Sequence, residues 1–250
     1  IEITFSQPAD AVISAANMHP VNAASSTSYV INNLHLQCSQ VIVDSALANS
    51  FKSLLASGRS LSIAIQTIFT QAHVHQANST SAQISMVRAL SKLGIVFVSY
   101  TDGAGGIRNQ EAISFANPSL VNQTGNETTA WSHLEFTLET QLQLDSFLYP
   151  ETKIDSSGEH FAKLSEAAAT YDQRLATLSI TPELYKSDGF VTGINLMRAP
   201  GSAFSGLNTR TGSLLLLKLN NLKTTTQKIY AHLVGTVLIE CRADSCSVYD

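Results

Sequence analysis

Two histidines, His73 and His75, stand one residue apart in a stretch of β-type sequence. Because successive side chains of a strand point to opposite faces, both imidazoles are expected on one face. Such a pair binds a metal when a carboxylate and a later histidine complete the ligand set. Here no Glu follows at a suitable distance, although His232 lies in a later strand pattern. We therefore predict no metal site and interpret the pair as surface or strand-end histidines.

Other chemistry-bearing residues form no recognisable catalytic set. The loop-like run from Gly201 to Gly206 lacks the strand–turn–helix context of a nucleophilic serine, and the glycines from 103 to 106 match no phosphate-binding loop. Glu135 and Glu139 share a strand pattern and Asp145 follows it, without a partner that would define an acid–base pair. We predict no catalytic residue and no cofactor site, and we expect that the protein is not an enzyme.

The chain has three cysteines, Cys38, Cys241 and Cys246. An odd number at wide spacing does not indicate a disulfide framework, and the C-x4-C pair has no nearby ligands to complete a zinc site. We interpret all three as buried free thiols. A disulfide between Cys241 and Cys246 across a tight turn is the alternative that the spacing leaves open.

Composition limits the classes of partner. Charged residues make up 14% of the 250-residue chain, well below the roughly 25% of an ordinary soluble domain. The net charge of −4 and the absence of a basic cluster argue against direct binding of nucleic acid. No apolar run is long enough for a transmembrane helix. Sequons at Asn78, Asn122 and Asn126 are expected by chance in a chain this rich in Ser, Thr and Asn, so they leave glycosylation undecided.

The periodicity of apolar residues predicts an all-β protein: an antiparallel, eight-stranded jelly-roll sandwich with two helical inserts and one long loop. We expect helices at about 45–57 and at about 158–178, the second capped by Ser156 or Ser157, and a loop at about 101–131 rich in Gly, Asn and Pro. The predicted strands lie at 29–44, 60–76, 82–100, 134–147, 190–197, 212–219, 228–240 and 245–249. The first is one strand with a bulge or two strands round a corner, and the more polar centre of the third, at 88–92, can form a bend.

Three of these predictions carry a local reason. The first helix follows the possible caps Asp44 and Ser45 and stops at Gly58, so we place it as an insert between two strands. Pro150 is expected to end the strand that precedes it. The apolar run at 228–240 is typical of a central strand that is buried on both faces.

We divide the chain into an N-terminal strand with a linker at 1–28 and a single jelly-roll domain at 29–250. The chain starts at Ile1, without Met, directly in the strand-like IEITF. We therefore expect a further segment upstream of it.

Several segments together resemble a known family. They are YVINNLHLQCSQVIVD (29–44), SGRSLSI (57–63), ISMVRALSKLGIVFVSY (84–100), FVTGINLMRAPGSAFSGLNTRTGSLLLLKLNN (190–221) and QKIYAHLVGTVLIECRADSCSVYD (227–250). Their order and texture resemble the C-terminal jelly roll of double jelly-roll major capsid proteins. These proteins build the shells of tailless icosahedral double-stranded DNA viruses, including the polinton-like and nucleocytoplasmic large DNA virus groups.

The resemblance implies a structural protein of the virion that self-assembles. It implies homotrimeric, pseudo-hexameric capsomers that contact neighbouring capsomers in an icosahedral shell, with minor capsid proteins as possible further partners. The loop at 101–131 would then be a tower or an arm between subunits. The alternative is a carbohydrate-binding, lectin-like jelly roll, which needs exposed aromatic residues, whereas the only tryptophan is Trp131 in the loop. A metal-dependent cupin enzyme, built on His73 and His75, is a third class.

Overall fold

The computed structural model of the chain describes residues 28, 30–102, 117–118, 138–172, 175, 180–181, 184–185, 189–197, 205–210 and 214–249. Several features discussed above lie outside these residues. They are the strand predicted at 1–5, the glycines at 103–106, nearly all of the loop at 101–131 with Asn122, Asn126 and Trp131, as well as Glu135 and residues 201–204.

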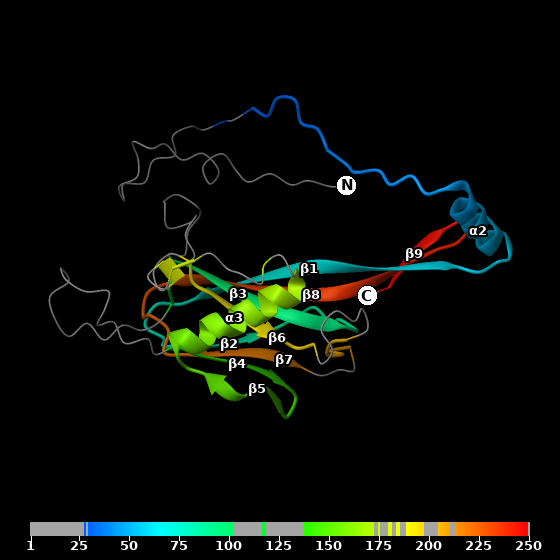
Figure 1. The fold of residues 1–250 in the computed structure, drawn as a ribbon. Helices are drawn as coiled ribbons and strands as arrows, with labels where there is room; N and C mark the ends of the chain where they lie inside the picture. The colour runs from blue at the N-terminus through cyan, green and yellow to red at the C-terminus, as the bar shows by residue number, and fades with distance from the viewer. Residues whose placement is uncertain are drawn as a thin grey trace.

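Two antiparallel sheets form the body of the protein (Figure 1). Sheet A has the order β1 (Leu61–His75), β8 (Gln227–Cys241), β3 (Leu93–Asp102) and β6 (Val191–Asn195), and β9 (Cys246–Tyr249) also pairs with β8. Sheet B has the order β2 (Ser81–Ser85), β7 (Leu215–Asn220), β4 (Glu139–Leu144) and β5 (Phe147–Ile154).

The strand pairing defines the topology as a jelly roll. β1 pairs with β8, β2 with β7, β3 with β6 and β4 with β5, so the first four strands run back along the last four in reverse order. The first and third of these pairs lie in sheet A, and the second and fourth lie in sheet B. This alternation is the topology of an eight-stranded jelly roll. The predicted fold class is confirmed, and β9 is an additional strand that forms a hairpin with β8.

Alternating side chains of both sheets meet in one core. On β7 and β4 every second residue is buried, and on β8 the same alternation holds from Gln227 to Leu233. The prediction that β8 is central is confirmed. Its predicted burial on both faces holds only at residues 233–235, where Val234 packs beneath α3, and elsewhere its outward side chains are half-buried. The largest fully buried side chains are Tyr100, Phe190, Leu90, Leu93, Ile95, Leu138, Leu142, Ile154, Leu217, Leu219, Leu222 and Ile229.

The helix α3 (Ser157–Tyr171) forms a third layer on the outer face of sheet A (Figure 1). Ser156 caps its start by accepting a hydrogen bond from the backbone of Glu159, as the sequence predicted. Ala167 packs with Ile95 and Val234 in a small second core between the helix and the sheet. The helix ends at Tyr171, earlier than the predicted 178.

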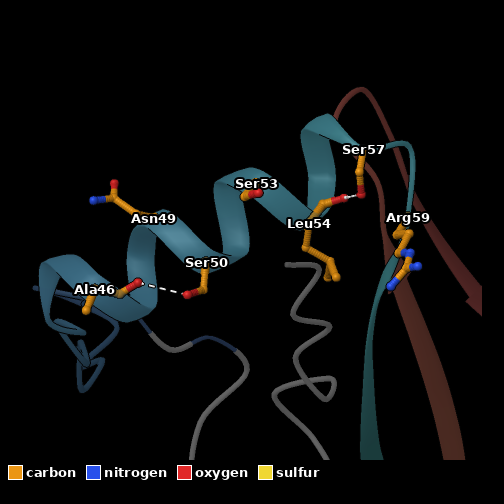
Figure 2. Close-up of a pocket in the computed structure, with 7 residues that line it drawn as sticks. All are labelled: Ala46, Asn49, Ser50, Ser53, Leu54, Ser57 and Arg59. Atoms are coloured by element: carbon orange, nitrogen blue, oxygen red, sulfur yellow. Dashed lines mark hydrogen bonds between the residues drawn. The ribbon is translucent and has the colours of Figure 1, made fainter.

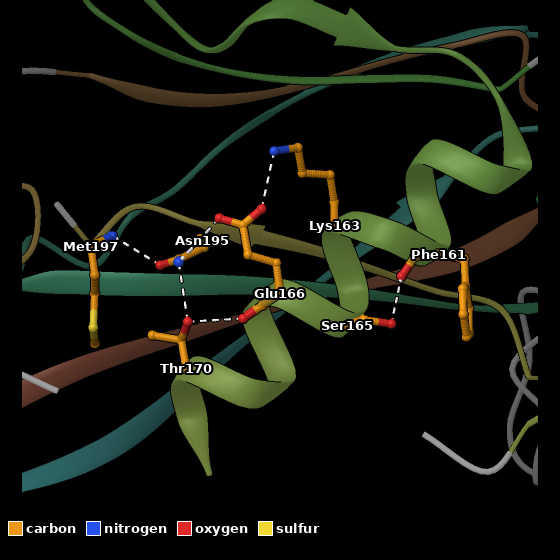
Figure 3. A network of polar contacts seen from close by, with 7 residues as sticks. All are labelled: Phe161, Lys163, Ser165, Glu166, Thr170, Asn195 and Met197. Atoms are coloured by element: carbon orange, nitrogen blue, oxygen red, sulfur yellow. Dashed lines mark hydrogen bonds and ion pairs between the residues drawn. The ribbon is translucent and has the colours of Figure 1, made fainter. Parts of the chain in front are cut away.

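Polar contacts fasten α3 to the end of β6 (Figure 3). The Asn195 amide donates to the Thr170 hydroxyl at 3.1 Å and to Glu166 Oε1 at 3.4 Å, while its oxygen accepts from the backbone of Met197 at 3.0 Å. Lys163 pairs with the other oxygen of Glu166 at 3.1 Å. The helix therefore has a fixed register against the sheet.

The β segment predicted at 82–100 forms two strands in different sheets, and the bend expected at 88–92 lies in the connection between them. β2 ends at Ser85 and β3 begins at Leu93. In the connection, Met86 and Leu90 stay buried while the chain crosses from sheet B to sheet A. The buried Thr209 hydroxyl accepts from Leu90 N at 2.8 Å and donates to Leu90 O at 3.1 Å, so a side chain satisfies backbone groups that no strand pairs.

The region around Pro150 also differs from the prediction. β4 turns back into β5 through Asp145, whose φ is +52°, and Pro150 lies inside β5 rather than after a strand. β5 is the outer strand of sheet B, where a proline that lacks an N–H removes no hydrogen bond from the sheet. The predicted strand at 134–147 therefore corresponds, within the described residues, to β4 and the first residue of β5.

Residues 30–43 form no strand, contrary to prediction, and lead directly into α2 (Ser45–Ala56). Asp44 caps α2 by accepting from Leu47 N at 2.8 Å, and Gly58 follows its end with φ +75°, as the caps in the sequence indicated. α2 precedes β1, the first strand of the sandwich, so its predicted place between two strands is wrong.

Candidate interaction surface

The longest strands of sheet A extend beyond the sandwich as a ribbon. We call this ribbon the arm and define it as Leu61–Gln66 of β1, Thr236–Cys241 of β8, and β9. β1 and β8 pair along all fifteen residues of each strand, from Leu61 with Cys241 to His75 with Gln227. Within the arm only Val237 is buried. Figure 1 shows the arm reaching toward α2, away from sheet B.

Large apolar side chains are exposed on this part of the molecule. Ile63 and Ile65 of β1 are 45% and 43% exposed, and Val248 of β9 is 63% exposed. α2 buries none of its residues. The exposed large apolar residues of residues 30–47 are Val30, Ile31, Leu34, Leu36, Val41, Ile42, Val43 and Leu47. Exposed apolar patches of this kind are a common feature of surfaces that interact with another protein or a membrane.

Charge is scarce on the same stretch of chain. Residues 30–87 contain only Asp44, Lys52 and Arg59 as charged residues, and none lies between 60 and 87. β1 is the outer strand of sheet A, and the edges of natural sheets are usually protected by charge, proline or a covering element. β1 has neither a charged residue nor a proline that would protect its outer edge.

A shallow groove runs along one side of α2 (Figure 2). Two serines of this side, Ser50 and Ser57, turn their hydroxyls back to the helix carbonyls of Ala46 and Leu54, at 3.0 and 2.7 Å. These hydroxyls are therefore satisfied locally, and the surface is smooth and weakly polar. Its lining residues are Ala46, Asn49, Ser50, Ser53, Leu54, Ser57 and Arg59.

The structure separates the three histidines considered for a metal site. His73 and His75 share the inner face of β1, as predicted, and His75 is buried with its Nε2 2.8 Å from Ser79 O. His232 pairs with the exposed Thr70 and so lies on the opposite face, with ring nitrogens 2.9 Å from Thr70 Oγ1 and 3.1 Å from Ser99 Oγ. Burial lowers the pKa of both His73 and His232, with His75 adding to the shift at His73.

The remaining candidate groups have structural roles where the structure describes them. Glu139 forms an ion pair with Lys153 and accepts a hydrogen bond from the Asn220 amide at 3.2 Å. Both contacts lower the pKa of Glu139, and the contact with Lys153 has the larger effect. Asp145 lies in the turn between β4 and β5. Among the described residues, no three His, Cys, Asp or Glu side chains gather as a possible metal site.

Nothing in the sequence indicated that His160 is buried. His160 of α3 is fully buried, with Nδ1 2.8 Å from Ser156 O and Nε2 3.0 Å from Thr140 Oγ1. Because a carbonyl only accepts, Nδ1 carries the proton and Nε2 accepts from Thr140. Burial lowers the pKa of His160 to about 4. Its position inside a helix pattern, next to Phe161, gave no signal that distinguishes it from a surface histidine.

The prediction that the cysteines are buried is wrong. Cys38 and Cys246 are exposed and Cys241 is half-buried. Cys241 and Cys246 face each other across the β8–β9 hairpin, and their sulfur atoms are 2.8 Å apart. The sequence left this pairing open because a C-x4-C spacing does not by itself place two thiols opposite each other.

No helix among the described residues is both long enough and apolar enough to cross a membrane. Asn78, the one sequon inside the described residues, lies in an exposed turn with φ +68°.

The fold and this surface together define a jelly-roll protein with an exposed, weakly charged apolar edge. The sequence matches no protein family and no curated protein. In solved structures, the chain is similar to VP54 of PBCV-1, fitted into a reconstruction of the virophage Sputnik, at 10% identity and a TM-score of 0.49, over 83% of this chain and 54% of that one.

Two further solved structures are similar. One is a quasi-atomic model of the PBCV-1 virus capsid, at 9% identity and a TM-score of 0.45, over 76% of this chain and 51% of that one. The other is the Sputnik virophage at 3.5 Å, at 10% identity and a TM-score of 0.43, over 76% of this chain and 38% of that one. The chain thus spans about half the length, or less, of these viral capsid proteins.

Proposed function

We propose that the chain is a structural capsid protein of a virion and has no enzymatic activity of its own. It assembles into trimeric, pseudo-hexameric capsomers that pack into an icosahedral shell. The observation that carries this proposal is the exposed apolar edge, formed by the arm, α2 and residues 30–43, on a jelly-roll body. The resemblance of the sequence segments to double jelly-roll capsid proteins supports the same function.

The physical basis of assembly is burial of this edge. Each exposed apolar side chain that a neighbouring subunit covers contributes roughly 25 cal/mol per Å² of buried apolar area. Because residues 60–87 carry no charge, covering them costs no desolvation of ion pairs. A specific and stable interface needs on the order of 800 Å² from each partner. An open edge strand of fifteen residues with a neighbouring helix is of the right scale for such an interface.

The test is the mass of the native particle. We expect light scattering and native mass spectrometry to find trimers, and electron microscopy to find capsomers or larger shells at higher protein concentration. The sample should contain the chain together with any segment that precedes it in the natural protein. The proposal is contradicted if the protein is a monodisperse monomer at all concentrations, or if it forms only a dimer that does not assemble further as the concentration rises.

The same preparation separates the capsid function from the lectin-like alternative. A glycan array is expected to give no binding above background, because the exposed apolar side chains of the described surface are aliphatic except for Phe147 and Tyr249. Specific retention of one sugar by a monomer would favour the carbohydrate-binding class instead.

A further inference from the structure

Two thiols occupy directly opposed positions at the tip of the arm. The register of β8 and β9 pairs Leu238 with Tyr249 and continues without a shift to Cys241 and Cys246. Only four residues, 242–245, separate the two cysteines. The hairpin therefore holds both sulfur atoms at one place without help from the rest of the fold.

The backbone pattern at this position suits a covalent bond. Arg242 N donates to Ser245 O at 2.7 Å, so residues 242 and 245 are a hydrogen-bonded pair of the ladder. Pairs alternate along an antiparallel ladder, so Cys241 and Cys246 are a non-hydrogen-bonded pair, whose Cα atoms lie about 4.5 Å apart. This separation falls inside the range of roughly 4.4–6.8 Å that a disulfide spans without movement of the backbone.

The sulfur atoms already approach within 2.8 Å. A zinc ion with bonds of about 2.3 Å in tetrahedral geometry holds two thiolates roughly 3.8 Å apart, so this site is too narrow for a metal bridge. Cys246 is exposed and Cys241 half-buried, so an oxidant in solution reaches Cys246 first. The hydrogen bond with Cys246 raises the pKa of the Cys241 thiol in the reduced hairpin, so Cys241 is less available as a thiolate for the first attack on an oxidant.

We propose that Cys241 and Cys246 form a redox-controlled disulfide that closes the β8–β9 hairpin. A small-molecule disulfide such as glutathione disulfide is the oxidant. The Cys246 thiolate attacks one of its sulfur atoms, forms a mixed disulfide and releases one glutathione thiol. The Cys241 thiolate then attacks Cys246 Sγ and releases the second thiol, so the protein loses two protons and two electrons and the oxidant gains both.

The bond changes what the tip of the arm can do. In the reduced hairpin only non-covalent contacts to β8 hold β9, and all four residues of β9 are exposed. The disulfide ties β9 to β8 covalently and keeps Val248 and Tyr249 on the arm. The thiol chemistry is independent of assembly, whereas its consequence, a more stable assembly edge in an oxidising medium, rests on the proposed function.

The experiment compares the chain after equilibration with reduced and with oxidised glutathione at pH 8. We expect the free thiols in denaturant to fall from three to one on oxidation, and the intact mass to fall by two hydrogen atoms. Trypsin cuts after the exposed Arg242 in the hairpin loop. It is expected to release residues 243–250 from the reduced chain, whereas the oxidised chain retains them until a reductant is added.

Two variants make the outcome specific. Cys246→Ser is expected to abolish the loss of thiols and the retention of the tryptic fragment, while the matched variant Cys38→Ser keeps both. Three persistent thiols, a disulfide that includes Cys38, or a stable glutathione adduct without ring closure would overturn the proposal. The C-terminal peptide reports the bond directly, so the assay does not depend on whether a variant assembles.

Discussion

Gly193 of β6 lies directly beneath Ala167 of α3, and a methyl group at Gly193 would come within 2.9 Å of the Ala167 Cβ. It would also lie 3.0 Å from the Cα of Leu164, which belongs to the helix backbone and cannot rotate away. Only glycine therefore allows α3 to pack this closely on the outer face of sheet A. The close approach in turn positions Asn195 to reach Thr170 and Glu166.

The first prediction tests this contact. Gly193→Val is expected to lower the free energy of unfolding by about 2–3 kcal/mol, because the helix must move away from the sheet or the strand must shift. Urea unfolding followed by circular dichroism measures the change. The control is Gly158→Ala, where nothing lies within 4 Å of the new methyl group, and its stability should be unchanged or slightly higher. Equal losses in both variants would contradict the packing argument.

The second prediction concerns pH. Burial lowers the pKa of His160 to about 4 in the folded protein, against about 6.5 in the unfolded chain. The unfolded chain therefore binds the proton more tightly. The contribution of His160 to stability is complete above pH 6.5 and is lost as the pH falls toward 4, by up to about 3 kcal/mol.

Chemical denaturation between pH 7 and pH 4.5 measures this slope. His73 and His232, whose pKa values are also lowered, act in the same direction, so the matched variant is His160→Gln. This variant should be less stable at pH 7 but should lose less stability on acidification than the wild type. The lowered pKa of Glu139 acts at a lower pH, near the ordinary range of a carboxyl group, and so does not mimic the effect.

The third prediction compares two isoleucines of paired strands. Ile229 of β8 is fully buried in the core and Ile63 of β1 is exposed on the arm. Ile229→Ala should cost about 2–5 kcal/mol through lost burial and the cavity that remains, while Ile63→Ala should cost little. Deletion of residues 230–240 should abolish folding altogether, because β1 and β3 both pair with this strand. Thermal unfolding distinguishes the three cases, and a folded deletion variant is the result that the topology forbids.

The fourth prediction addresses assembly. A double variant, Ile63→Lys with Ile65→Lys, should leave the stability of the subunit within about 1 kcal/mol of wild type, because both side chains are exposed. It should shift the native mass toward the monomer, since buried lysines at an interface lose their hydration. Val87→Lys is the matched control, because Val87 is 84% exposed in the connection between β2 and β3. If the control disrupts assembly as strongly as the double variant, the arm is not the interface.

Local chemistry determined much of this fold. Caps at Asp44 and Ser156 predicted where two helices begin, because a side-chain oxygen that accepts from the first turn acts over only three residues. Apolar, strand-type runs predicted the strands from β6 to β9, period-two alternation predicted β1, and the order of the strands led to a jelly roll. The capsid interpretation likewise came from the order of sequence segments.

Tertiary structure decided which segments pair as strands and which side chains are covered, and the alternation of apolar residues cannot predict either. Residues 30–43 alternate as a strand does, yet they remain unpaired with any other described strand, because a strand needs a second chain segment for its hydrogen bonds. The apolar residues Met86 and Leu90 did not indicate that the chain crosses from sheet B to sheet A between β2 and β3. Both side chains are buried in the core, and a continuous strand would bury them as well. Cys241 and Cys246 are close because β9 pairs with the end of β8. The end of β1 that begins at Leu61 is exposed because sheet B does not extend as far as the arm (Figure 1). Sequence spacing records neither, because both are properties of pairing and coverage in three dimensions.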